Sequence, residues 1–393
     1  MKNRGLKTKL REVKANVKNA DKFLLLLIMI FAAFGLVVVF SSSNITAVLH
    51  YHYEPTYFFF KQLAFTIAGI IIMFILAYFV SDKWYFGSSI IGIVILFILF
   101  VLLRAMGSIN DSQSWYSFQG ASFQPSEFAK PIIIVFLACW FNSVRNYKPW
   151  WKIFIPIGVV VALCIFIALE PDVGTAGVIA FITMLIVLTL PIKHKLVTWA
   201  RIGVVVVAIV GIIGLYAFQD KFISRETSSR QESRFAFTKP CDRPLAKTGY
   251  QVCNAYIAIN NGGLFGRGFG QSTQKFLYLP EAYTDFVFPI VVEEIGLLGA
   301  SAVLLAYLLL LFQILVIARN ATNLQDSIIA FGTFSYILVH IIINLAGVLA
   351  LIPMTGIPLP FLSYGGSFLL NLFILLGLTL RVSANNKRFK KGA

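Results

Sequence analysis

Long apolar runs, separated by polar stretches, make up most of this chain. Runs of roughly 18–25 residues recur, and in a lipid bilayer each run can satisfy its own backbone only as a helix. The runs lie near residues 23–43, 59–80, 84–103, 126–142, 153–169, 173–190, 202–218, 288–318, 328–350 and 363–382. The pattern predicts an all-α, polytopic membrane protein with about ten transmembrane helices.

The polar stretches are unequal in length, and the longest, about 219–287, is predicted to be one large extracytoplasmic loop. The chain then divides into a basic N-terminal tail (1–22), a transmembrane domain (23–382) and a basic C-terminal tail (383–393). The first apolar run follows basic residues, but it is too long for a signal sequence and lacks a small-residue cleavage site. We expect it to stay in the mature protein.

Composition and charge agree with this assignment. The chain is 58% hydrophobic and 13% charged, whereas soluble globular domains are about 25% charged. The net charge is +16, and basic residues crowd into both tails and into the predicted inner turns around Lys83, Lys148, Lys195 and Arg319. Both termini are therefore expected in the cytoplasm. Anionic headgroups at the inner surface account for the basic charge, so no nucleic-acid partner is expected.

The segment 250–294 is a polar strip between apolar runs, and Asp285 lies near its end, just before a predicted helix. An acid at the mouth of a membrane cavity is a candidate for proton chemistry. Asp285 is therefore a candidate general base at the outer end of the predicted spans.

Other polar residues lie where predicted spans begin or end. Glu127 and Lys130 fall on one face of a predicted helix, either as part of a wet cavity or as a structural ion pair. Glu170 and Asp172 lie at an outer turn, which is either functional or simply solvated. Asn344, deep in a span, needs a partner and is interpreted as a contact between helices.

The remaining signals are weaker. The glycines of GGLFGRGFG (262–270) lack a βαβ context, so they indicate tight turns or close backbone approach to a ligand rather than a dinucleotide site. His50 and His52 are interpreted as an outer polar patch, and no metal site is predicted. Cys241 and Cys253 share the outer loop; they form either a disulfide or two free thiols.

Six motifs occur together: QPSEFAK (124–130), EPDVGTA (170–176), GGLFGRGFGQSTQK (262–275), LPEAYTDFVF (279–288), EE (293–294) and GIPLPFLSYGGS (356–367). Together they resemble the SEDS family of cell-wall polymerases, which contains FtsW, RodA and a sporulation relative. The resemblance covers about residues 20–385 and is nearer to the division-type FtsW branch than to the elongation-type RodA branch.

The resemblance implies a peptidoglycan glycosyltransferase of the bacterial plasma membrane that polymerises lipid II, at the division septum for the FtsW branch. It places the essential aspartate of the family at Asp285, which is expected to act as the single base, with Glu281 as a second carboxylate that one inversion does not require. The partner implied is a class B penicillin-binding protein, alongside other membrane proteins of the division machinery. Whether Mg²⁺ or Mn²⁺ is needed stays open.

Further residues are candidates for binding the substrate. In the reaction that the resemblance implies, a sugar hydroxyl displaces a lipid pyrophosphate, which needs cations as it departs. Those cations are expected to be Lys130, Lys275, Arg267 and Arg104, in that order. The other candidate contacts are Glu127, Glu281, Gln251 and Ser363.

The chain departs from the family pattern at two places. Gln113 and Ser114 precede Trp115 where a basic residue is usual, and Tyr283 stands where a histidine is common. Two other classes of function also fit about ten spans, a lipid II flippase and a non-catalytic division scaffold. The position of the candidate chemical groups at the outer face favours the polymerase.

Overall fold

The structure is a computed structural model. It describes residues 11, 13–106, 116–118, 121–144, 150–170, 172–191, 198–199, 201–203, 205–206, 239–242 and 247–392. Most of the predicted span 202–218 and the loop segment 219–238 lie outside the described residues, as do Gln113, Ser114 and Trp115.

Seven helices in the described part of the chain are long and apolar enough to cross a membrane. They are α2 (Lys22–Leu49), α3 (Tyr57–Tyr78), α4 (Tyr85–Met106), α5 (Pro125–Val144), α11 (Val287–Arg319), α12 (Leu324–Val348) and α13 (Gly366–Gly392). Two shorter apolar helices, α6 (Ile155–Leu169) and α7 (Val173–Thr189), lie between α5 and the outer loop. These helices coincide with every predicted span except 202–218, which confirms the helical, polytopic architecture.

Smaller elements were not foreseen from the sequence. Two three-residue strands, β1 (Tyr116–Phe118) and β2 (Ala121–Phe123), pair antiparallel with Tyr116 opposite Phe123. A further helix, α10 (Lys247–Gly262), lies within the predicted outer loop. Three short 3₁₀ turns complete the described fold: η1 (Asp82–Trp84), η2 (Trp150–Ile153) and η3 (Pro240–Asp242). Strands of three residues are too short to show a hydrophobic period, so sequence patterning does not detect them.

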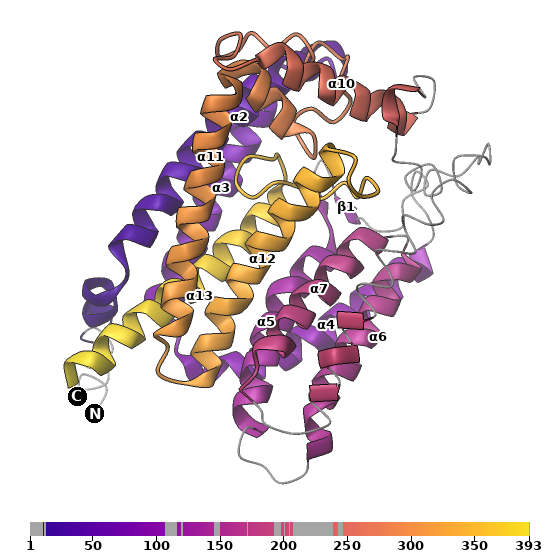
Figure 1. The fold of residues 1–393 in the computed structure, drawn as a ribbon. Coiled ribbons are helices and arrows are strands. Elements are labelled where there is room, and N and C mark those ends of the chain that lie inside the picture. The colour runs from indigo at the N-terminus through magenta and orange to yellow at the C-terminus, as the bar shows by residue number, and fades with distance from the viewer. Residues whose placement is uncertain are drawn as a thin grey trace.

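The helix α12 lies at the centre of the bundle (Figure 1). It packs against α11 and α13 on one side and against α5 and α7 on the other, while α13 packs closely along α3. Small polar residues start several helices: Asp21 accepts from the Leu24 N–H at 2.9 Å to cap α2, and Asn323 accepts from the Asp326 N–H at 2.8 Å to cap α12. Such caps satisfy N–H groups that the first helical turn leaves unpaired.

The helix α11 contains a break at Gly296, whose φ of +73° and ψ of 176° are not helical. The glycine-rich loop before α11 replaces the lost hydrogen bonds. The N–H groups of Arg267 and Gly268 donate to the carbonyls of Glu293 and Glu294 at 2.9 and 3.0 Å, and Leu297 N–H donates to Gly263 O at 2.9 Å. The glycines therefore allow close approach to a neighbouring backbone.

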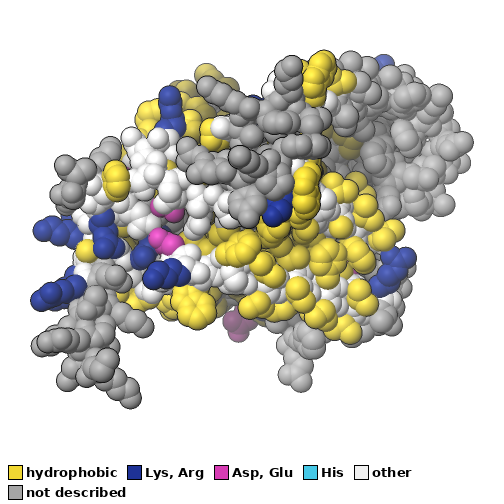
Figure 2. Space-filling model, turned by 90° about the horizontal axis from the view of Figure 1, so that it is seen from below, with side chains coloured by type: hydrophobic (Ala, Val, Ile, Leu, Met, Phe, Trp, Pro, Cys, Tyr) yellow, Lys and Arg dark blue, Asp and Glu magenta, His cyan; other side chains and the backbone are white. Residues whose placement is uncertain are grey.

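The two ends of the bundle differ in chemistry. The end of α13 and the start of α2 lie together at one end, and α10 and the strip leading into α11 lie at the opposite end (Figure 1). At the first end, Arg381 Nε lies 3.2 Å from Asp82 Oδ1, and Asn385 Nδ2 donates to Asp82 and Asp326 at 3.0 and 3.2 Å. Figure 2 shows Lys and Arg side chains around this end, with apolar side chains along the flanks.

Candidate functional site

Asp285 lies in the turn that leads into α11, and it is half-buried. The Thr284 hydroxyl lies 3.0 Å from Asp285 Oδ1 and 2.7 Å from Glu281 Oε2. A hydroxyl has one proton to donate, so the two carboxylates share it. Glu281 itself is exposed and adopts a φ of +55°. The structure thus brings together the two acids singled out in the loop, with Asp285 as the more enclosed one.

Asn344 of α12 fixes the position of this turn. Its Nδ2 donates to the main-chain carbonyl of Asp285 at 2.7 Å and to that of Ile357 at 2.8 Å. Both bonds use main-chain carbonyls, so Asn344 holds the turn through its backbone. The sequence predicted a contact between helices for Asn344, whereas the structure shows contacts to two non-helical segments.

A small hollow opens beside Asp285 and is lined in part by Asn344, Met354, Thr355 and Gly356. Gly356 has a φ of +70°, and a Cβ there would lie 3.7 Å from Asp285 Oδ2. The segment between α12 and α13 therefore passes directly over the carboxylate. The sequence showed this segment only as part of the family motif GIPLPFLSYGGS (356–367) and did not predict its place beside Asp285.

Lys130, on α5, is buried inside the bundle. Its Nζ donates to Glu127 Oε1 at 2.6 Å and to His340 Nε2 at 3.3 Å. His340 Nδ1 lies 2.7 Å from the carbonyl of Tyr336. The carbonyl can only accept, so Nδ1 carries the proton and Nε2 accepts from Lys130. The ion pair expected at i, i+3 forms, and it gains a histidine partner that the sequence did not indicate.

The face of α12 connects Lys130 with Asp285. His340 contacts Lys130, and Asn344, four residues later, contacts the Asp285 turn. Residues at i and i+4 lie on one face of a helix, about 6 Å apart along its axis. The cation and the candidate base therefore lie along the same face of α12.

The turn between α6 and α7 joins the same region. Asp172 Oδ2 accepts from Gln124 Nε2 and from the Ser126 hydroxyl, both at 2.8 Å, while its other oxygen accepts from Thr175 N–H at 3.2 Å. At Gly174, a Cβ would lie 3.1 Å from the carbonyl oxygen of Thr355, which lines the hollow beside Asp285. Of the two interpretations of this turn, the structure contradicts the solvated one.

Glu170 lies buried in that turn. The pKa of Glu170 is raised to about 7, mainly by burial and also by the neighbouring Asp172 carboxylate, while Arg104 opposes the shift. Arg104 is exposed at the end of α4, and its positive charge acts on Glu170. Arg104 therefore lies near the turn between α6 and α7.

Lys275 and Arg267 come from the glycine-rich loop and have different surroundings. Lys275 is buried, and its Nζ donates to Gly270 O at 2.6 Å, Glu294 Oε1 at 3.2 Å and Ser41 Oγ at 3.4 Å. All three ammonium protons are used internally. Arg267 is exposed, with Nη1 3.2 Å from the Thr273 hydroxyl and 3.9 Å from Glu293 Oε1. Of the two cations, Arg267 is therefore the one that is exposed to a ligand at the surface.

Glu293 and Glu294 organise this loop, which the sequence analysis noted only as a family motif. Glu293 is fully buried and accepts from the hydroxyls of Ser272 and Thr273 at 2.5 and 2.7 Å and from Asn261 Nδ2 at 3.1 Å. Two adjacent acids inside an apolar span are the signal that identifies them, because buried carboxylates need dedicated partners.

Ser363 and Gln251 are the remaining two candidates. The Ser363 hydroxyl accepts from Leu359 N–H at 2.7 Å, and Gln62 Nε2 donates to the Ser363 carbonyl at 3.2 Å. Ser363 therefore shapes the turn before α13. Gln251 is half-buried on the first turns of α10.

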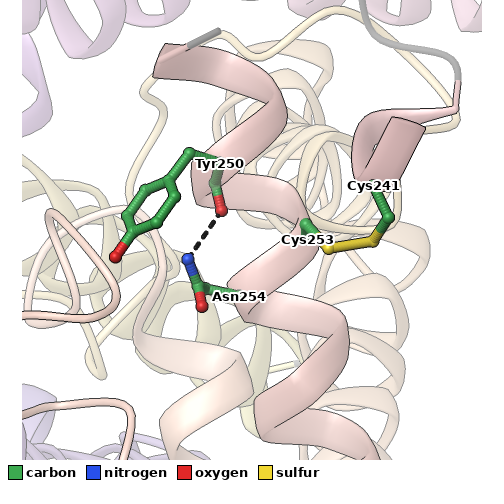
Figure 3. The surroundings of a disulfide bond; sticks show 4 residues. All are labelled: Cys241, Tyr250, Cys253 and Asn254. Carbon is green, nitrogen blue, oxygen red and sulfur yellow. Dashed lines mark hydrogen bonds between the residues drawn. A yellow bond between two sulfur atoms is a disulfide. The ribbon is translucent and has the colours of Figure 1, made fainter. Parts of the chain in front are cut away.

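A disulfide joins Cys241 of η3 to Cys253 of α10, with the two Cα atoms 4.9 Å apart (Figure 3). Beside Cys253 on the same helix, Asn254 Nδ2 donates to the carbonyl of Tyr250, one turn earlier, at 2.9 Å. The disulfide tethers η3 to α10, which lies in the described part of the predicted outer loop. Elsewhere, no group of three or more His, Cys, Asp or Glu side chains suited to a metal ion occurs among the described residues.

Comparison with known proteins places these motifs in a family. The family model for FtsW, RodA and SpoVE, described as cell cycle protein, matches residues 21–388. The chain belongs to this family. With its apolar helices, this membership identifies a bacterial membrane protein.

Two relatives from Bacillus subtilis (strain 168) are similar over nearly the whole chain. The probable peptidoglycan glycosyltransferase FtsW is 35% identical over 96% of this chain and 93% of its own. Stage V sporulation protein E is 36% identical over 92% of this chain and 96% of its own. The division and sporulation members are thus equally similar by this measure.

Solved structures share the fold. A chain from a peptidoglycan synthase complex that coordinates polymerization and crosslinking aligns with a TM-score of 0.69 at 24% identity, covering 93% of this chain and 98% of that one. The rod shape determining protein RodA of Thermus thermophilus aligns with a TM-score of 0.64 at 23% identity, covering 93% of this chain and 97% of RodA. Both likenesses concern the fold.

Proposed function

We propose that this chain is a peptidoglycan glycosyltransferase that polymerises lipid II for septal wall synthesis. The observation that carries the proposal is the placement of the Asp285 turn and the buried Lys130 ammonium along one face of α12, through Asn344 and His340. Several family motifs from distant parts of the chain surround that face. Curated relatives named as peptidoglycan glycosyltransferases over nearly the full chain support it.

The proposed reaction forms a bond between a sugar hydroxyl oxygen and the anomeric carbon of the donor sugar. The bond from that carbon to the lipid pyrophosphate breaks, and the hydroxyl proton passes to Asp285. An α-phosphate that yields a β-linkage needs a single inversion, so one base is sufficient. Glu281 then serves to orient the turn through Thr284 rather than to attack the sugar.

The leaving pyrophosphate requires positive charge nearby. We assign this role first to Lys130, then to the exposed Arg267 and Arg104. Lys275 ranks behind them, because all three of its ammonium protons have internal acceptors, whereas Lys130 donates to two, Glu127 and His340. Mg²⁺ or Mn²⁺, if required, would find hard oxygen ligands on the pyrophosphate itself, and adding a chelator to the polymerisation assay tests this.

The proposed setting is the bacterial plasma membrane, with both tails in the cytoplasm and the Asp285 end outside. The distribution of basic residues supports this orientation. The proposed partners are a class B penicillin-binding protein that crosslinks the new strands, and other membrane proteins of the division machinery. The similarity of the fold to a chain from a peptidoglycan synthase complex supports a partner of this kind.

Asp285→Asn tests the proposal. The two side chains are nearly isosteric, so folding should be kept, while loss of the base should lower lipid II polymerisation about 10²–10⁴-fold. The matched control is Glu281→Gln, which neutralises the neighbouring carboxylate on the same Thr284 hydroxyl and should keep most activity. Substantial polymerisation by purified Asp285→Asn protein would eliminate Asp285 as the base.

A further inference from the structure

Aromatic rings form a continuous row at the outer end of the molecule. The aromatic row consists of Tyr51, Tyr53, Tyr57, Phe58, Tyr283 and Tyr364. The rings of Tyr51 and Tyr53 stack almost in parallel, with centroids 5.9 Å apart and 6° between their planes. Phe58 links this outer pair to the inner pair, since its centroid lies 5.6 Å from Tyr51, 4.8 Å from Tyr283 and 5.1 Å from Tyr364.

The row runs from the surface into the protein. Tyr51 and Tyr53 are 41% and 46% exposed, whereas Tyr283 is only 6% exposed. The hydroxyl of Tyr283 lies 3.5 Å from that of Tyr51. The outer rings therefore offer flat apolar faces together with phenolic hydroxyls, a combination that suits a ligand with both C–H faces and hydroxyl groups.

The inner end of the row adjoins the candidate base. Tyr283 precedes Asp285 by two residues, and its main-chain carbonyl accepts from Tyr364 N–H at 2.8 Å. Tyr364 belongs to the segment between α12 and α13, and an earlier part of that segment, residues 354–357, lines the hollow beside Asp285. Phe58 and Tyr283 therefore connect the exposed end of the row to the turn that carries Asp285.

We propose that the aromatic row is a glycan subsite, which holds sugar rings of the strand as it leaves the reacting bond. The inference rests on the proposed function, because it takes the strand to be made at Asp285. Pyranose rings present a face of C–H groups that packs on an aromatic face, and their hydroxyls can bond to the phenols. Tyrosines at a membrane boundary also serve as interfacial anchors, and the experiment separates that role from glycan binding.

The test measures binding of a soluble tetrasaccharide of alternating N-acetylglucosamine and N-acetylmuramic acid, without lipid, to the full chain in nanodiscs. The double variant Tyr51→Ala, Tyr53→Ala should bind it about fivefold to tenfold more weakly and should produce shorter strands from lipid II. The double variant Tyr51→Phe, Tyr53→Phe keeps the rings and should keep most of the binding. Tyr278→Ala removes an exposed tyrosine that lies between α10 and α11, outside the aromatic row, and should change neither.

Two results would overturn the subsite. One is a double alanine variant that binds the tetrasaccharide and sets strand length as the unaltered chain does. The other is equal loss of binding in the phenylalanine variant, because the stacking faces are retained there. Asp285→Asn should still bind the tetrasaccharide, so failure of the catalytic proposal and failure of the subsite give different results.

Discussion

Lys130 and Glu127 show how a charge is kept inside this membrane protein. The lysine is 1% exposed and its Nζ lies 2.6 Å from the glutamate. A buried ion pair contributes little net stability, but removing one partner leaves the other uncompensated. The His340 ring at 3.3 Å from Lys130 completes the arrangement on the α12 side.

Lys130→Met should therefore lower both stability and activity. The unpaired Glu127 should cost roughly 3–5 kcal/mol of unfolding free energy, measurable as a lower unfolding temperature in detergent. Adding Glu127→Gln to the same protein removes the orphaned charge and should restore most of the stability. If Lys130 contacts the pyrophosphate, the double variant should still polymerise poorly, and full activity of the double variant would exclude that contact. Normal stability of the single variant Lys130→Met would contradict the role of the ion pair.

At the level of single residues, the sequence identified Asp285, Glu127 and Lys130 as groups worth examining, because charges next to apolar spans need a reason. It did not identify His340, since an isolated histidine in an apolar stretch carries no partner in its spacing. It also ranked Lys275 second among the cations, whereas the fold gives all three of its protons internal acceptors.

Among the elements, the broken helix α11 and the glycine-rich loop form one unit. Gly266 has a φ of +80°, and a Cβ there would lie 2.3 Å from the carbonyl oxygen of Glu294. Gly270 has a similar φ of +76°, but nothing lies within 4 Å of its Cβ position. Replacing Gly270 therefore tests backbone strain alone, whereas replacing Gly266 tests backbone strain together with a steric clash.

Gly266→Ala should destabilise the protein clearly more than Gly270→Ala. The second change carries only the left-handed backbone strain of about 1–2 kcal/mol, while the first must also push the loop away from α11. Unfolding temperatures of the two purified variants provide the measurement. Equal destabilisation would show that the loop does not rest on the α11 backbone in the folded protein.

The disulfide between Cys241 and Cys253 should stabilise the outer loop. Closing a loop with a sequence separation of 12 residues is worth roughly 3 kcal/mol in the chain-entropy account. After denaturation without reductant, mass spectrometry should find Cys139 and Cys164, which are free thiols in the structure, alkylated, and Cys241 and Cys253 unmodified. Alkylation of all four thiols under these conditions would discard the bond.

For the whole molecule, one lipid-facing surface is suited to a partner helix. Along α11, the side chains of Leu297, Leu298, Leu305, Leu308 and Leu309 are exposed. The stretch of small residues at Ala346–Ala350 is less suited to a partner, because Gly347 lines the hollow beside Asp285. We therefore expect the penicillin-binding protein to pack on α11.

Binding at α11 should raise polymerisation several-fold, because a partner that prefers the productive position of the Asp285 turn shifts the population toward it. The double variant Leu305→Ala, Leu309→Ala should weaken this activation. The matched control, Ile91→Ala with Ile95→Ala, changes an equally exposed pair on α4 and should leave activation unchanged. Equal rates with and without the partner at saturating lipid II would rule the mechanism out.

The sequence by itself determined that the chain lies in a lipid bilayer, that its architecture is helical, and which residues are most of the candidates for the chemistry. Apolar runs of membrane length permit only helices when no water is present to satisfy the backbone, so these conclusions need no tertiary contact. The family resemblance followed from short motifs whose order along the chain is visible in the sequence.

Only the tertiary structure decided which candidates meet. Residues from separate segments come close only because of how α5, α7, α11 and α12 pack, and no local pattern encodes that packing. The residues brought together in this way are Gln124, Asp172, Asp285, Asn344 and Thr355. The same holds for the glycines of 262–270, whose sequence indicated close backbone approach without its partner. That partner is the α11 backbone, because the break at Gly296 frees hydrogen-bonding groups that only a neighbouring backbone without side chains can reach.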